Sequence, residues 1–159
     1  PVLVFTMEEI WLERFPGDDS SIHLEDFVAV PEGWQDDALA EKWATIRTVR
    51  RVVTGALEVE RTNKMIGASL EAAPTVYVEH GPSGILQTVS FDDLCITSGI
   101  QISTDAAPAG AFRLDDVADV AVVFAQADGD KCQRCWKILP DVGSHSHAGV
   151  CGRCEDALS

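Results

Sequence analysis

The chain has 159 residues and an apolar content of 46%, which is typical of a globular protein with one ordinary domain or two small ones. No apolar run approaches the roughly 20 residues that a membrane-spanning helix needs. The opening stretch, PVLVFTMEEIW, has neither the basic segment of a secretory signal peptide nor an initiator Met. We therefore expect a cytoplasmic piece of a longer chain, away from membranes. A monomer is expected as well.

The formal net charge is −14, which by itself argues against binding to nucleic acid. The basic residues are unevenly distributed, however, and ten of the twelve lie in residues 35–64 and 131–159. Because local charge decides which surface meets phosphate, these two segments are candidates for contact with a nucleic acid. Ordinary solvated surface is the alternative, and charge does not choose between the two.

A first helix is expected directly after the opening apolar run. Thr6 and Glu9 have the spacing of a capping box, and Phe5 and Ile10 have that of a hydrophobic staple. The Pro-Gly pair that follows ends this helix. From residue 18 to residue 33 the composition is loop-like. Four apolar side chains are expected to hold this loop against the core: Ile22, Leu24, Phe27 and Val28.

A long helix is expected from Asp36 or Asp37, either of which can cap it, to about Lys64, with Gly67 as its end. Apolar residues recur along it at helical spacing and predict a buried face: Leu39, Trp43, Ile46, Val49, Val53 and Leu57. The basic residues lie off that face: Arg47, Arg50, Arg51, Arg61 and Lys64. This flank suits contact with a phosphate backbone and suits plain solvation, and both interpretations stay open.

Residues 68–130 predict a small α+β unit. Strands are expected at residues 75–78, 94–96, 100–102 and 119–126, with a turn at 80–82 and a short helix within 84–93. Cys95 lies in an apolar run and is expected to be packed rather than reactive. The acidic residues show no pattern of paired catalytic carboxylates, and the chain has no glycine-rich phosphate loop and no Ser/His/Asp pattern, so we expect no catalytic residue in it.

The strongest signal is KCQRCWKILPDVGSHSHAGVCGRC, residues 131–154. It holds two Cys-x-x-Cys pairs with 15 residues between them. Each pair presents two sulfurs from one tight turn, so the two pairs together offer the closed tetrahedral set of thiolates that a structural Zn²⁺ uses. The predicted zinc ligands are Cys132, Cys135, Cys151 and Cys154.

Three other roles for these cysteines are weighed against zinc. Disulfides are disfavoured by the odd count of five cysteines, and a redox pair by its duplication around one loop. Iron in a four-sulfur cage is not distinguished from zinc by spacing. His145 and His147 are expected to be loop residues, because four cysteines already fill the coordination shell. A closed site does no chemistry, so its role would be to fold this segment and present it.

Taken together, these features resemble the C-terminal part of bacterial isoleucyl-tRNA synthetases. The resemblance rests on PVLVFTMEEIW, on RTNKMIGASLEA at residues 61–72, on LCITSG at residues 94–99 and on the two cysteine arms, KCQRCW and VCGRC. It covers nearly the whole chain, more loosely at residues 79–91 and 104–116. It implies an α+β chain that is part of a ligase joining isoleucine to its tRNA, tRNA(Ile), with ATP and Mg²⁺.

The resemblance also implies three domains. Residues 1–67 would be the end of an anticodon-binding helical domain, residues 68–130 a small α+β junction domain, and residues 131–159 a four-cysteine zinc-binding module. The HIGH and KMSKS signatures and the editing domain of that family are absent here. The chain itself would be a non-catalytic grip on the anticodon end of the tRNA.

Carried over residue by residue, the four cysteines match the zinc ligands of the family, and Arg134 and Trp136 match positions turned toward the anticodon. Unpaired bases stack on an indole and accept hydrogen bonds from a guanidinium. Packing over the zinc knuckle is the alternative role for Trp136, and a bond to its own turn is the alternative for Arg134. Further contacts with tRNA are expected from four residues of the long helix: Arg47, Arg51, Arg61 and Lys64.

Two functions from other classes remain. A zinc-finger DNA glycosylase has a similar C-terminal knuckle and an N-terminal Pro-Glu, but here Val2 follows Pro1. A rubredoxin-like iron protein would use the same four-sulfur cage. Metal analysis separates zinc from iron at once.

Overall fold

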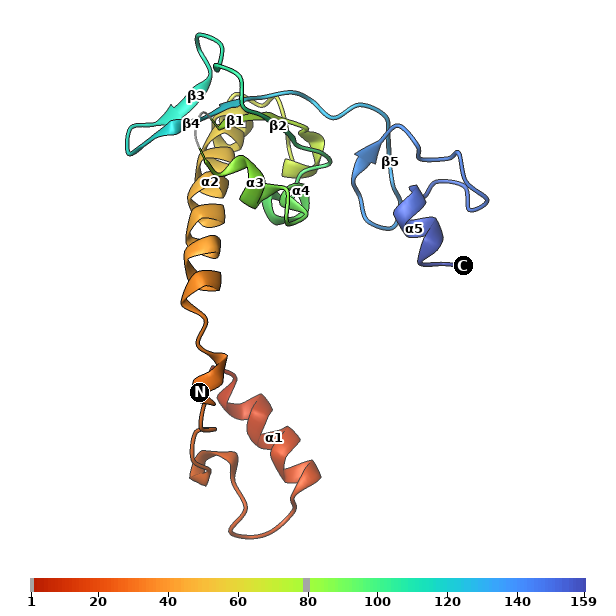
Figure 1. Ribbon diagram of the computed structural model, residues 1–159. Coiled ribbons are helices and arrows are strands. Elements are labelled where there is room, and N and C mark those ends of the chain that lie inside the picture. Colours follow the sequence, from red (N-terminus) through yellow and green to blue (C-terminus); the bar gives the residue numbers. More distant parts are fainter. Residues whose placement is uncertain (1, 79–80) are drawn as a thin grey trace. The chain divides into compact units, whose positions relative to one another are not determined.

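The computed structural model describes residues 2–78 and 81–159 (Figure 1). The chain divides into two compact units, Pro1–Asp36 and Asp37–Ser159. Helices and a small mixed sheet are both present, so the predicted α+β class is confirmed. In these described ranges, no helix combines the length and the apolar character that crossing a membrane requires.

The first unit consists of a helix and a returning loop with two 3-10 turns: α1 (Val4–Arg14), η1 (Ile22–Leu24) and η2 (Glu32–Trp34). The Trp11 indole donates a hydrogen bond to Ser20 Oγ over 3.0 Å. The Glu8 carboxylate accepts hydrogen bonds from the Ser21 hydroxyl and the Ile22 amide, each over 3.0 Å. Polar contacts therefore organise this unit, whose three helical segments contain no buried residue.

The predicted capping box and hydrophobic staple are wrong. The helix begins at Val4, so Thr6 lies inside α1 and not at its N-cap, which makes no side-chain cap bond. Phe5 and Ile10 are 84% and 56% exposed, and no staple forms between them. The end of the opening apolar run, Val4 and Phe5, therefore lies in the first turn of the helix rather than before it.

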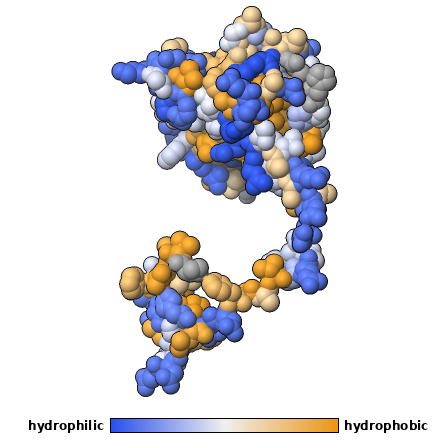
Figure 2. Space-filling view, turned by 90° about the vertical axis from the view of Figure 1, so that its left-hand side faces the viewer, coloured by the Kyte–Doolittle hydropathy of each residue, from blue (hydrophilic) through white to orange (hydrophobic). Residues whose placement is uncertain are grey.

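The apolar residues of the loop are also not held against a core, contrary to expectation. Leu24, Phe27 and Val28 are 75%, 88% and 87% exposed, and Figure 2 shows apolar surface on this unit in orange. Ile22 is half-buried. The cause is that the loop meets α1 through polar side chains, which leaves its apolar side chains uncovered by the rest of the unit.

The second unit is built around α2 (Asp37–Thr62), a helix of 26 residues. Its buried residues match most of the predicted face: Ile46, Val49, Val52, Val53, Ala56 and Leu57. Trp43 is partly buried against the same cluster, whereas Leu39 is 47% exposed, contrary to prediction. The sheet and the short helices cover the C-terminal part of α2 and leave its first turns uncovered (Figure 1).

The end of α2 differs from the prediction that Gly67 terminates it. The Met65 amide donates to the Glu60 carbonyl over 2.9 Å and the Lys64 amide donates to the Arg61 carbonyl over 3.1 Å, which is the Schellman pattern. Lys64 occupies the left-handed position of this motif, with φ 60°. The helix therefore turns at a lysine, where glycine is the usual residue.

A four-stranded sheet packs on the C-terminal part of α2 in the order β2-β1-β4-β3. A 3-10 turn leads into it, and the elements are η3 (Ser69–Glu71), β1 (Thr75–Val78), β2 (Gln101–Ser103), β3 (Phe112–Leu114) and β4 (Val117–Val123). β1 runs parallel to β2 and antiparallel to β4, which forms a hairpin with β3. Val76 of β1 pairs with Val122 of β4, and both are buried in the core shared with α2. Three predicted strands are confirmed, and β3 was not predicted.

The connection from β1 to β2 carries two short helices, α3 (Ser83–Leu86) and α4 (Phe91–Cys95). The predicted strand at residues 94–96 is wrong, because Ile96 caps α4 in the left-handed conformation with φ 58°. Cys95 is 2% exposed, as expected of a packed thiol, and burial raises its pKa to about 12. The predicted turn at residues 80–82 begins at His80, which lies outside the described residues.

The remaining part of the second unit is a small module with β5 (Asp130–Lys131), β6 (Ile138–Leu139) and α5 (Gly152–Asp156). Gly129 precedes it with φ 110°, and a Cβ there would lie 2.3 Å from the carbonyl carbon of Leu139. Only glycine therefore fits where the chain enters the module. The buried residues of the module form a cluster of their own, separate from the core under the sheet.

Candidate metal centre

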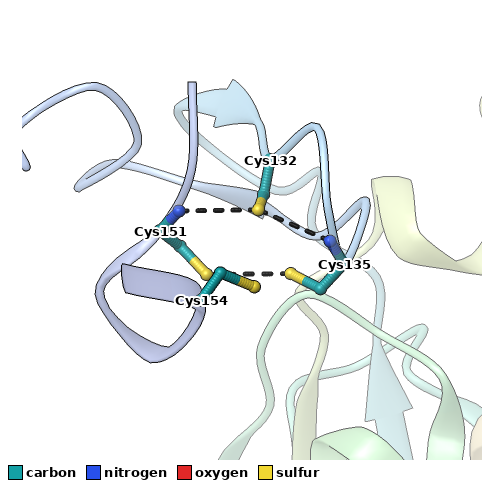
Figure 3. A group of neighbouring side chains, drawn as sticks. All are labelled: Cys132, Cys135, Cys151 and Cys154. Carbon is teal, nitrogen blue, oxygen red and sulfur yellow. Dashed lines mark hydrogen bonds between the residues drawn. The ribbon is translucent and has the colours of Figure 1, made fainter. Parts of the chain in front are cut away.

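Four sulfur atoms meet inside this module (Figure 3). Cys132 and Cys135 lie in the turn between β5 and β6, Cys151 caps α5, and Cys154 lies within α5. The four ligand atoms lie within 4.8 Å of one another, and all four cysteines are free of disulfides. The structure thus brings together the four residues that the spacing singled out as ligands.

The distances between the sulfurs suit a tetrahedral metal. Zn–S bonds of about 2.3 Å place the corners of a regular tetrahedron about 3.8 Å apart. The Cys135 and Cys151 sulfurs are 3.7 Å apart, whereas a disulfide would bring them to about 2.05 Å. The site therefore fits a four-coordinate Zn²⁺ with no open position, although the donor set alone would also accept iron.

Two backbone amides point at one of the sulfurs. The amides of Cys135 and Cys151 each donate to Cys132 Sγ over 3.5 Å (Figure 3). Burial opposes ionisation of Cys132, but these hydrogen bonds lower its pKa to about 6. Burial raises the pKa of Cys135 to about 12. A bound cation is therefore what would hold all four sulfurs as thiolates.

Arg134 and Trp136 both lie on the surface of the module. Arg134 Nη1 donates to Cys154 Sγ on the opposite arm over 3.6 Å, and its side chain is otherwise exposed. Four thiolates around one Zn²⁺ carry two net negative charges, which the guanidinium partly offsets. Trp136 is 61% exposed with φ 68°, and the ammonium of Lys131 lies 5.5 Å from its ring centroid.

The two histidines of the loop lie outside the sulfur group, as predicted. His145 Nε2 lies 3.0 Å from Asp141 Oδ2, and His147 Nδ1 lies 2.9 Å from Glu155 Oε2. The hydrogen bond from the Ser146 hydroxyl, together with smaller contributions from His147, lowers the pKa of Glu155 to about 2. The Asp141 carboxylate also accepts a hydrogen bond from the Gly152 amide of α5 over 2.7 Å, so Asp141 and Glu155 both connect the loop to α5.

The candidate RNA contacts on α2 fall into two groups. Arg51 forms an ion pair with Asp116 over 2.7 Å, and Arg61 forms an ion pair with Glu58 and donates a hydrogen bond to Ser69 Oγ. Arg47 and Lys64 are exposed, and neither forms an ion pair with another described residue. Arg47 and Lys64 are therefore more available to an external phosphate than Arg51 and Arg61.

Sequence reasoning missed the residues that hold the module against α4. Lys137 is 8% exposed, and its Nζ lies 2.5 Å from Asp92 Oδ2 and 2.6 Å from Asp93 Oδ1. Arg153 Nη1 lies 2.9 Å from Asp93 Oδ2. The hydrogen bond from Lys137, aided by Arg153, lowers the pKa of Asp93. In the sequence these residues are ordinary members of a basic and an acidic segment, and no motif pairs them.

Comparison with known proteins gives two results. Residues 129–157 match the family described as "Zinc finger found in FPG and IleRS", a range that includes all four cysteines. The chain is 59% identical over 159 residues, 99% of its length, to the isoleucine–tRNA ligase of Ruegeria pomeroyi. It is 56% identical to that of Brucella abortus and 52% identical to that of Agrobacterium fabrum, each over 91% of its length.

The chain spans 15–16% of the length of these relatives. The finger is shared by two kinds of protein, whereas the similarity outside it is to isoleucine–tRNA ligases. The four sulfurs thus lie in the stretch that matches the zinc finger found in FPG and IleRS, and the chain as a whole is similar to one segment of the isoleucine–tRNA ligases.

Proposed function

We propose that the chain is the tRNA-binding C-terminal segment of an isoleucine–tRNA ligase and grips the anticodon end of tRNA(Ile). The observation that carries the proposal is the 59% identity over 99% of the chain. The complete enzyme would join isoleucine to tRNA with ATP and Mg²⁺ in parts outside this chain, in the cytoplasm and as a monomer. The division into residues 1–67, 68–130 and 131–159 belongs to the same proposal.

In this proposal the metal is structural. The buried cluster of the module consists of three cysteines and Val150, so little apolar side chain is available to hold it together. Binding of Zn²⁺ to such a site contributes on the order of 10–16 kcal/mol to folding. The ion would therefore fix the turn that carries Arg134 and Trp136, and take no part in chemistry.

The surface of the module suits a single-stranded loop of RNA. Trp136 offers an exposed indole, and base stacking on an aromatic side chain is worth about 1–3 kcal/mol. Arg134 uses one donor on Cys154, and a guanidinium has others that can reach base edges or phosphate. Lys131 beside the indole adds positive charge at the same place. These features support contact with RNA despite the net charge of −14.

The test measures binding of the chain to tRNA(Ile) and to the same transcript with a swapped anticodon, at two salt concentrations. We expect a preference for the cognate anticodon that persists at the higher salt concentration. Binding through phosphate alone would weaken steeply with salt and ignore the anticodon, which would contradict the proposal. A count of one zinc per chain by mass spectrometry would confirm the metal.

Trp136→Ala gives the site-specific version of this test. Loss of a stacked base predicts a decrease in affinity of roughly 5- to 150-fold for about 1–3 kcal/mol, with the zinc content unchanged. Trp136→Phe is the matched comparison, because it keeps an aromatic ring on which a base can stack and should therefore retain most of the affinity. Equal affinity of the Trp136→Ala variant and the parent chain would assign Trp136 a purely structural role.

A DNA-binding module like that of the zinc-finger DNA glycosylases is the second candidate, since the finger family includes FPG. Its test is competition by duplex DNA that contains an abasic site. We expect such DNA to compete no better than duplex DNA without the lesion. Preferential competition by the lesion would favour the glycosylase-like function instead.

A further inference from the structure

We infer that Lys137, Asp92 and Asp93 are positioning residues that set the orientation of the zinc module on the sheet domain. Through this orientation they would fix the direction in which Trp136 faces RNA. The second step rests on the proposed function, whereas the first rests on contacts between described residues alone. Neither the finger family nor the similarity to isoleucine–tRNA ligases assigns these residues a role.

The seam between the module and α4 is polar rather than apolar. The buried cluster around the sulfurs and the core under the sheet do not merge. Between them lies a cleft of about 240 Å³ whose lining includes Ser90, Asp92 and Asp93 on one side and Lys137 and Arg153 on the other. With no shared apolar core across it, the relative orientation depends on a few directed contacts.

Lys137 provides the most central of these contacts. Its side chain is 11% exposed, and its ammonium lies within 2.6 Å of a carboxylate oxygen of both Asp92 and Asp93. It is also the residue directly after Trp136, whose backbone is fixed in the left-handed region. Any rotation of the module about this seam would therefore move the indole with it.

A hydrogen-bonded serine fixes the next residue. Ser98 is 4% exposed, and its hydroxyl donates to the Leu70 carbonyl over 2.5 Å. The same oxygen accepts a hydrogen bond from the Ile138 amide over 2.7 Å. The backbone amide of Ser98 donates to the Ala72 carbonyl over 3.0 Å. Lys137 and Ile138 are thus both attached to the connection between β1 and β2. Through Ser98, Ile138 is also linked to the segment that precedes β1.

The two arms of the module show which side faces the protein. Arg134 and Arg153 occupy the same position of their Cys-x-Arg-Cys turns. Arg153 forms an ion pair with Asp93, whereas Arg134 contacts Cys154 within the module, and both arginines are exposed. The arginine of the second arm therefore contacts α4, whereas Arg134 and Trp136 remain accessible.

The orientation is tested by NMR residual dipolar couplings of the 159-residue chain with zinc bound. In the parent chain, one alignment tensor should fit the amides of the sheet and those of residues 131–156. Lys137→Met should require two tensors, whereas Lys137→Arg should restore one. Lys42→Met makes the same charge change on α2, at a lysine that forms no ion pair with another described residue, and should keep one tensor. The visible spectrum of the Co²⁺-substituted module should be the same in all variants.

A single tensor in Lys137→Met, with the metal site intact, would overturn the positioning role. The positioning role would also be contradicted by two results together. These are a changed Co²⁺ spectrum in Lys137→Met and a requirement for two tensors in Lys137→Arg, because Lys137 would then act on the folding of the module. These measurements need no RNA, so they stand whether or not the proposed function is correct.

The second step is tested with the cognate and anticodon-swapped transcripts. A small misplacement of an interacting group can weaken its effect by orders of magnitude. Lys137→Met should therefore lower the preference for the cognate anticodon by about tenfold or more. In the double variant with Trp136→Ala, the loss should not exceed that of Trp136→Ala alone, because Lys137 acts through the indole. Additive losses would overturn this step. A parent chain that shows no anticodon preference would instead refute the proposed function.

Discussion

A Cβ atom on Gly55 would lie 3.0 Å from two ring carbons of Phe112, so α2 and β3 touch at a helix position that has no side chain. Gly55→Val should therefore destabilise the second unit by about 1–3 kcal/mol, although valine is a better helix former than glycine. The free energy of unfolding in urea measures this. Gly84→Val in α3 is the control, because an added Cβ there meets nothing within 4 Å.

A smaller residue at position 112 provides a second check on this contact. Phe112→Leu should be less harmful in the Gly55→Val background than in the parent chain, because it removes the ring that the new side chain strikes. Equal costs of Phe112→Leu in both backgrounds would mean that the helix and the hairpin accommodate valine without the predicted clash.

Removal of the metal should unfold the module and leave the sheet intact. The cluster around the sulfurs and the core of α2 and the sheet are separate, and the former consists largely of the cysteines themselves. After treatment with a chelator, amide resonances of residues 131–156 should collapse to random-coil shifts while those of Val76 and Val122 persist. Global unfolding by the chelator would show that the sheet depends on the finger.

The four cysteines of the module should differ from Cys95 in the reactivity of their thiols. Burial raises the pKa of Cys95 to about 12, so its thiol stays protonated, and it is 2% exposed in the core under the sheet. After metal removal in native buffer, iodoacetamide should modify the four cysteines of the module and spare Cys95. Peptide mass spectrometry reads out each site, and addition of guanidinium should make Cys95 react as well.

Lys64 should show opposite effects on stability and on RNA binding. Its left-handed conformation costs a residue with a side chain roughly 1–2 kcal/mol, so Lys64→Gly should raise the free energy of unfolding by about 1 kcal/mol. If its ammonium contacts phosphate, the same change should weaken tRNA binding. Lys64→Ala removes the charge and keeps the strain, so both variants should bind equally weakly, and only the glycine variant should be more stable. Undiminished binding in both would exclude the phosphate contact.

The grouping of the four sulfurs could be predicted from the sequence because a Cys-x-x-Cys pair is a local signal whose geometry is set by one turn. The long helix could be predicted for a similar reason, since apolar residues such as Ile46 and Val53 recur at its period. Both features depend on residues near one another in the chain.

The failures concern contacts that local patterns do not specify. Leu94 and Cys95 have strand-like composition, but they end α4 because Ile96 takes a left-handed conformation. Thr6 and Glu9 have the spacing of a capping box, but the helix begins earlier. The pairing of Lys137 with Asp92 joins residues 45 positions apart, and no periodicity in the sequence announces it.

The parallel pairing of β1 with β2 has a consequence for the order of folding. α4 lies in the connection between these two strands, and α4 carries the carboxylates that receive the finger. We therefore expect Asp92 and Asp93 to reach the positions in which they contact Lys137 only when β1 and β2 have paired. A finger that binds its metal ion before these strands pair would be folded, but it would not yet be held against α4.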